Sequence, residues 1–100
     1  MKYPKYELTL HKTYYDKGFF NLGVSVDSYI KSNNGTMQIL LGKSKKEIIG
    51  RLNRNANLNH TARIYGGNEL KGWFQSNFNL TDLVLVYVLA PSIIWITSIE

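Results

Sequence analysis

The fold class follows from the stretch Leu83-Val84-Leu85-Val86-Tyr87-Val88-Leu89-Ala90-Pro91-Ser92-Ile93-Ile94-Trp95-Ile96-Thr97-Ser98-Ile99, near the end of this 100-residue chain. Valine, isoleucine and aromatic side chains dominate it, and these residues favour strands. A membrane-spanning helix needs about 20 uninterrupted apolar residues, whereas this stretch is shorter and is broken at Pro91-Ser92. We therefore predict two buried strands, Leu83–Ala90 and Ile93–Ile99, and no association with a membrane.

Immediately upstream, an apolar stripe predicts the one clear helix of the chain. Leu70, Trp73, Phe74 and Phe78 recur near helical spacing, which is typical of a helix that covers a core with one face. Asn68 precedes them and is a favourable N-cap residue. We expect a helix over about residues 68–78, with Trp73 and Phe74 buried.

Further towards the N-terminus, alternation and turn residues predict five more short strands. Their ranges are Lys5–Lys12, Phe19–Gly23, Met37–Lys43, Lys46–Leu52 and Ala62–Tyr65. Val24–Ile30 is expected as a short helix or turn, and Thr81-Asp82 as the turn before the last two strands. No repeat or linker divides the chain, so we expect a single, mostly β domain over residues 1–100, folded as a closed or half-open barrel.

The residues needed for most enzyme chemistry are missing from the sequence. There is no cysteine, which excludes disulfides, thiolate metal sites and a thiol nucleophile and favours a reducing, intracellular setting. The two histidines, His11 and His60, lack the spacing and the neighbouring carboxylates of a zinc site. No nucleotide-binding or hydrolase motif is present. We expect no catalytic residues, no metal and no cofactor in this chain alone.

Positive charge is concentrated in the middle of the chain. The net charge is +5, and the excess falls within residues 43–63, because lysines and carboxylates balance elsewhere. All three arginines, Arg51, Arg54 and Arg63, lie in this stretch. A local excess of this kind is typical of a surface that binds a polyanion, although a merely solvated basic face would have the same composition.

Within this stretch, the run Arg51-Leu52-Asn53-Arg54-Asn55-Ala56-Asn57-Leu58-Asn59-His60-Thr61-Ala62-Arg63 contains no carboxylate. Asparagine can pair with the N6 and N7 edge of adenine, and arginine with the O6 and N7 edge of guanine. Together with threonine and histidine, such residues suit both phosphates and base edges. An ordinary polar loop is the alternative interpretation.

Residues 50–82 also carry a resemblance to a known family. The segment Gly50–Ile64, followed by the pattern Gly66-Gly67-x-x-Leu70-x-x-Trp73-Phe74-x-x-Asn77-Phe78-x-x-x-Asp82, resembles the recognition domains of restriction endonucleases of the EcoRII, BfiI and NgoAVII type. These are similar in turn to the plant B-three transcription-factor domain, whose helix is matched at Gly72-Trp73 and whose turn is matched at Asp82. The Tyr14-Tyr15-Asp16 segment and the asparagine-rich run depart from the plant pattern.

The resemblance implies a seven-stranded DNA-binding pseudobarrel with one or two short helices. It further implies that two arms, residues 11–18 (the first arm) and residues 53–63 (the second arm), hold duplex DNA in its major groove. The chain would then be the target-recognition module of a restriction endonuclease in the prokaryotic cytoplasm, with a fused or associated nuclease. The candidate DNA-binding residues are His11, Lys12, Thr13, Tyr15, Asp16, Lys17, Arg51, Asn53, Arg54, Asn55, Asn57, Asn59, His60, Thr61 and Arg63.

Side-chain chemistry gives these candidates different expected roles. Lys12, Thr13, Tyr15 and Lys17 suit phosphates, and Asp16 could accept a hydrogen bond from cytosine N4. Arginine and asparagine in the second arm are the expected base readers. Tyr14 and Tyr15 of the first arm could instead pack against the end of the barrel. His60 of the second arm could instead be a solvent-exposed loop residue without a DNA contact.

Two other functions remain open from the sequence. An OB-like barrel could bind single-stranded DNA or RNA by stacking bases on exposed aromatic rings. Alternatively, the domain could mediate protein interactions, with an incidental basic patch. Competition between duplex and single-stranded oligonucleotides separates the nucleic-acid functions from each other, and a failure to bind any nucleic acid at low salt would favour the protein-interaction function.

Overall fold

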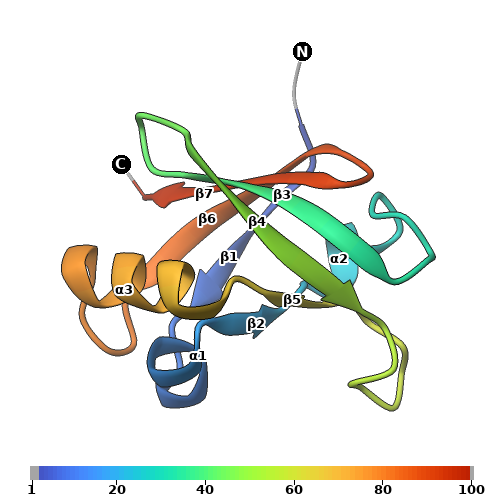
Figure 1. Cartoon of the computed structure of the whole chain (residues 1–100), viewed down its shortest axis with the longest axis horizontal. Coiled ribbons are helices and arrows are strands. Elements are labelled where there is room, and N and C mark those ends of the chain that lie inside the picture. The colour runs from blue at the N-terminus through green and yellow to red at the C-terminus, as the bar shows by residue number, and fades with distance from the viewer. Residues whose placement is uncertain (1–2, 100) are drawn as a thin grey trace.

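A computed structural model describes residues 3–99 and shows a single sheet of seven strands (Figure 1). The strands are β1 (Lys5–Thr9), β2 (Phe19–Asn21), β3 (Gly35–Leu41), β4 (Lys46–Asn53), β5 (Arg63–Tyr65), β6 (Leu83–Ala90) and β7 (Ile93–Ser98). All seven expected strands are present, and the fold is mostly β as predicted. Their ends differ by a few residues; β1, for example, ends at Thr9 because a helix begins at Lys12.

The sheet curls into a half-barrel with the strand order β1-β6-β7-β3-β4-β5-β2. Neighbouring strands are antiparallel except β3 and β7, which are parallel. The two edge strands, β1 and β2, are joined by a side chain: the Tyr6 hydroxyl donates to the Asn21 carbonyl at 3.1 Å. Burial raises the pKa of Tyr6 above its ordinary range, so this hydroxyl keeps its proton and remains a donor.

Within the described part of the chain, three short helices accompany the sheet, whereas one or two were expected. They are α1 (Lys12–Lys17), α2 (Val24–Asp27) and α3 (Gly67–Asn77). Helices α1 and α3 lie together at one end of the half-barrel (Figure 1). Gly18 ends α1 with φ +74° and its carbonyl accepts the N–H of Gly66. A side chain at Gly18 would place its Cβ against the Gly67 carbonyl oxygen, so this junction requires glycine.

The core fills the inside of the half-barrel with alternate residues of the long strands. In β6, for example, Val84, Val86 and Val88 point inward and are buried, while Leu85 and Tyr87 between them are half-buried. The predicted pair of terminal strands is therefore confirmed; in β7, Ile94 and Ile96 point inward, and Thr97 is buried on the opposite side of the sheet. Within residues 3–99, no helix is long and apolar enough to cross a membrane.

Helix α3 corrects two details of the sequence interpretation. It begins at Gly67 after an N-cap at Gly66 that makes no side-chain cap bond, so Asn68 is a helical residue rather than the cap. Phe74 is fully buried, as expected, but Trp73 is only partly buried and packs edge-on against Phe78. The reason is rotational: one helical step of about 100° turns Trp73 away from the face that covers the core.

Candidate nucleic-acid interface

The two predicted arms lie at opposite ends of one short strand pair, β2 and β5. Helix α1 leads into Phe19 at the start of β2, and the second arm leads into Arg63 at the start of β5. The strands are antiparallel, with Phe19 opposite Tyr65 and Asn21 opposite Arg63. Because β2 spans only three residues, roughly 7 Å of strand separates its ends. Residues far apart in the sequence thus flank one small surface.

That surface, called here the outer face, is the outward side of β2, β5 and β4. Phe20, Ile64 and Leu52 occupy equivalent register positions and are buried, so their chain neighbours point outward. The outer face consists of two cross-strand rows, which are Phe19, Tyr65 and Arg51 in one row and Asn21, Arg63 and Asn53 in the other. It carries two arginines and no carboxylate.

Aromatic and guanidinium groups pack together on the outer face. The guanidinium of Arg63 lies 4.7 Å from the centre of the Phe19 ring. The centres of the Phe19 and Tyr65 rings are 5.5 Å apart. Tyr14 of α1 contacts the Phe19 ring edge-on at 5.8 Å. Phe19, Tyr65 and Asn21 were missed from the sequence, because only the register of β2 against β5 brings them into the site.

Helix α1 forms the first arm and presents most of its polar residues to solvent. His11, Lys12, Thr13 and Lys17 are exposed. Among the described residues, the Lys17 side chain makes no ion pair, whereas Lys12 Nζ lies 2.5 Å from a carboxylate oxygen of Asp16 one turn later. Asp16 therefore offsets part of the charge of this arm.

Tyr15 differs from the other members of the first arm. Its hydroxyl donates to the Phe78 carbonyl at 2.9 Å, and its ring packs against the core. The Tyr15 carbonyl accepts a hydrogen bond from the Gln75 amide at 3.1 Å. In this structure Tyr15 ties α1 to α3, which corresponds to the packing role that the sequence left open.

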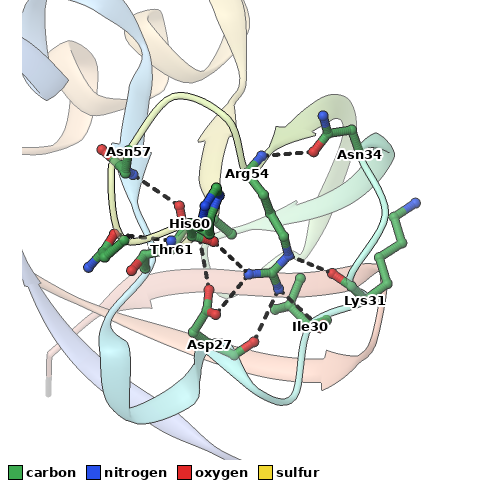
Figure 2. A network of polar contacts seen from close by, with 10 residues as sticks. Asp27, Ile30, Lys31, Asn34, Arg54, Asn57, His60 and Thr61 are labelled. Carbon is green, nitrogen blue, oxygen red and sulfur yellow. Dashed lines mark hydrogen bonds and ion pairs between the residues drawn. The ribbon is translucent and has the colours of Figure 1, made fainter.

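The second arm is anchored by a single carboxylate, that of Asp27 at the end of α2 (Figure 2). One carboxylate oxygen accepts the backbone N–H of Ala62 at 2.9 Å, and the other accepts Arg54 Nη1 at 2.8 Å. Asp27 thus holds the arm near both of its ends. Both side chains are largely shielded from solvent, with 14% of Arg54 and 24% of Asp27 exposed. Sequence analysis missed Asp27, which lies 27 positions before its partner.

Arg54 points towards α2 and the segment that follows it, as Figure 2 shows. A guanidinium has five N–H donors, and here five hydrogen bonds leave it. Nε donates to the Lys31 carbonyl, Nη1 to the Asp27 carboxylate and the His60 carbonyl, and Nη2 to the carbonyls of Asp27 and Ile30. No donor remains for a base edge in this conformation. The Arg54 side chain instead fixes the path of the second arm.

A second hydrogen-bond cluster joins the arm to the outer face. The Asn57 amide nitrogen donates to the Asn21 side-chain oxygen and to the Thr61 carbonyl, both at 3.0 Å. Arg63 donates from Nε to the same Asn21 oxygen and from Nη2 to the Asn57 oxygen. The Asn53 side-chain oxygen accepts the backbone N–H of Asn55. Asn53, Asn57 and Thr61 therefore use these hydrogen-bonding groups inside the protein, where they stabilise the conformation of the arm.

The exposed residues of the second arm are Asn55, Ala56, Leu58, Asn59 and His60, and they form its outward side. The Asn55 amide makes no side-chain hydrogen bond among the described residues, so its donor and acceptor are both available. Asn59 uses only its side-chain oxygen, which accepts the N–H of Thr61. His60 adopts a left-handed backbone conformation with φ +62°.

The basic stretch of the sequence is divided in space. Lys43 and Lys45 lie in the turn between β3 and β4, and Lys46 begins β4, whereas the arm begins where β4 ends. At about 3.3 Å per residue, the two ends of β4 lie roughly 23 Å apart. Lys45 Nζ also lies over the Trp95 ring, 4.6 Å from its centre. These lysines do not belong to the outer face.

No protein-family model matches the chain, and the curated proteins contain no significant relative. Among residues 3–99, histidine and carboxylate side chains nowhere gather in threes, as metal ligands would. The geometry of the outer face and its two arms is therefore the basis for proposing a function.

Proposed function

We propose that this chain binds duplex DNA sequence-specifically, with the outer face against the DNA and the two arms directed into the major groove. The observation that carries the proposal is the placement of two arms, far apart in sequence, at the two ends of the β2–β5 pair. The ends of β2 lie roughly 7 Å apart, which is within the width of about 12 Å of a major groove. We expect Lys12, Lys17 and Arg51 to contact phosphates, and Asn55, Asn59 and His60 to contact base edges.

Two features favour duplex over single-stranded DNA. Stacking of unpaired bases needs free aromatic faces, but the Phe19 ring is covered by Arg63 and contacted by Tyr14. In addition, the second arm is held by a dense hydrogen-bond network around Asp27 and Arg54. A rigid arm suits the fixed pattern of donors and acceptors in a groove.

The enzyme context of the module rests on its resemblance to restriction-endonuclease recognition domains. On that basis we propose a fused or associated nuclease that cleaves near the bound site, in the cytoplasm of a prokaryote. The chain itself would contribute recognition and no chemistry.

The proposal is tested by selecting a preferred site from random duplex oligonucleotides and measuring affinity by fluorescence anisotropy. We expect the selected duplex to compete better than a random duplex, and both to compete better than either separated strand. Preference for a single strand would favour the stacking barrel, and no binding at low salt would favour a protein-interaction domain.

The first mutational prediction concerns how the affinity for DNA depends on salt concentration. The logarithm of the affinity should fall linearly with the logarithm of salt concentration, with a slope of roughly −0.9 per phosphate contact. Lys17→Ala should reduce the magnitude of that slope by about one and weaken selected and random duplexes equally. Lys46→Ala removes the same charge at the far end of β4 and is the matched control. Equal effects of the two variants would contradict the placement of the DNA on the outer face.

The second mutational prediction concerns sequence specificity. Asn55 has a free amide on the outward side of the arm, so Asn55→Ala should cost about 1–3 kcal/mol on the selected site and less on random duplex. Asn77→Ala, an exposed asparagine at the end of α3, should change neither affinity. If both duplexes weaken by the same factor in Asn55→Ala, this residue contacts the backbone and does not read a base.

A further inference from the structure

The second arm carries an apolar side chain that neither its fold nor its hydrogen bonds explain. Leu58 is fully exposed at the tip of the arm, and Val24 at the start of α2 is 76% exposed. Both line a hollow of about 410 Å³ between the arm and α2. The other described residues that line it are Asn21, Leu22, Asn57, Asn59 and Thr61, and none of them is charged. A small apolar spot with amides around it suits a group that combines a methyl with a hydrogen-bonding edge.

Thymine presents such an edge in the major groove, because its C5-methyl group lies beside the O4 acceptor. The structure offers a complementary pair of groups in adjacent residues of the arm. The Leu58 side chain supplies the apolar surface. The Asn59 side-chain oxygen accepts the N–H of Thr61 at 3.1 Å, whereas its NH₂ group donates to none of the described residues, so both of its N–H donors are available to a base. We propose that Leu58 and Asn59 together recognise a thymine, through its methyl group and O4.

The only other 5-methylated pyrimidine edge of comparable shape is that of 5-methylcytosine. Its exocyclic group beside the methyl is an N4 amine, a donor. A donor at that place would face the NH₂ group of Asn59 and could pair only with the Asn59 oxygen, which already accepts the Thr61 N–H. The hydrogen bonds of the second arm therefore favour thymine. Methylated cytosine is tested separately in the experiment below.

The inference rests on the proposed duplex-DNA function and is tested with base analogues in the selected duplex. Each thymine is replaced in turn by uracil, which removes only the methyl group. At one position we expect a loss of affinity of about fourfold, which corresponds to burial of one methyl-sized group. Leu58→Ser should bind the thymine duplex less tightly and should no longer distinguish thymine from uracil there. Leu83→Ser, which changes an exposed leucine on β6, should retain the distinction.

The possible results separate this inference from the function on which it rests. Absence of any duplex preference would overturn both. Sequence-specific binding that is insensitive to uracil at every position, or equally sensitive in Leu58→Ser, would overturn the thymine contact alone. A gain of affinity when a cytosine is replaced by 5-methylcytosine, lost in Leu58→Ser, would assign the hollow to a methylated cytosine and overturn the role of Asn59 as a donor.

Discussion

Replacing Arg54 with alanine is expected to lower the free energy of unfolding by about 3–5 kcal/mol. The guanidinium makes five hydrogen bonds, one of them part of an ion pair with Asp27, and both side chains are largely shielded from solvent. Its removal leaves a partly buried carboxylate and several carbonyls without partners, which is costly. Urea unfolding followed by tryptophan fluorescence measures the loss.

Arg51→Ala is the matched control, because Arg51 is an exposed arginine on β4 only three positions away. Its effect on stability should stay within about 0.5 kcal/mol, while its loss should weaken DNA binding. A stable Arg54→Ala protein that has lost only its preference for the selected site would show that Arg54 reads a base and would contradict the anchoring role.

The ion pair itself can be isolated with a double-mutant cycle that includes Asp27→Asn. Asparagine preserves an acceptor for the Ala62 N–H but removes the charge. A coupling free energy of roughly 0.5–3 kcal/mol between Asp27 and Arg54 is expected for groups in direct contact. This measurement also remains informative if the single Arg54 variant is only marginally folded, since Arg54→Lys can replace it in the cycle.

Phe74→Ala is expected to have an effect of similar size, about 3–5 kcal/mol. Phe74 is fully buried on the face of α3 that covers the open end of the half-barrel. Alanine would leave a cavity that the surrounding strands, fixed by their hydrogen bonds, cannot close. The change should appear as a lower midpoint of urea unfolding with an unchanged slope.

Two neighbours on α3 serve as comparisons for Phe74. Trp73→Ala should cost distinctly less, because Trp73 is only partly buried and packs mainly on Phe78 and Phe74. Ser76→Ala changes an exposed position and should be nearly neutral. A larger loss for Trp73 than for Phe74 would mean that α3 is rotated about its axis relative to the structure described here.

For the second arm, anchoring and recognition reside in different residues. Arg54, Asn57 and Asp27 use their polar groups inside the protein, whereas Asn55 and Asn59 keep groups free on the outward side. Fixing the arm before binding lowers the entropy lost on forming a complex. Variants of the anchoring residues should thus affect stability first, and variants of the outward residues should affect affinity alone.

Much of the secondary structure could be predicted from local patterns. The apolar runs in β6 and β7 and the stripe of Leu70 and Phe74 in α3 were recognised correctly. Such patterns depend on the spacing of side chains a few positions apart, which each segment carries by itself. Helix α1 was missed because its apolar members, Tyr14 and Tyr15, pack against different partners and form no stripe.

The candidate site was predictable only in part. Residues 11–18 and 53–63 were predicted as arms from the resemblance and from their polar composition, and the structure brings both segments to the β2–β5 pair; their contact with nucleic acid stays a prediction. The sequence could not reveal that Arg54 turns inward, because its partner carboxylate lies 27 positions away. It also could not separate Lys43, Lys45 and Lys46 from the arm, since the eight residues of β4 place these lysines and the arm at opposite ends of that strand.

The sequence by itself determined the strands, the helix stripe and the residue types of the arms, because these depend on local spacing and side-chain chemistry. The tertiary structure alone decided the strand order, the parallel pairing of β3 with β7 and the outer face formed by the register of β2 on β5. Pairings between distant segments depend on how the whole chain buries its apolar surface. No single segment carries that information, and the roles of Asp27 and Arg54 follow from it.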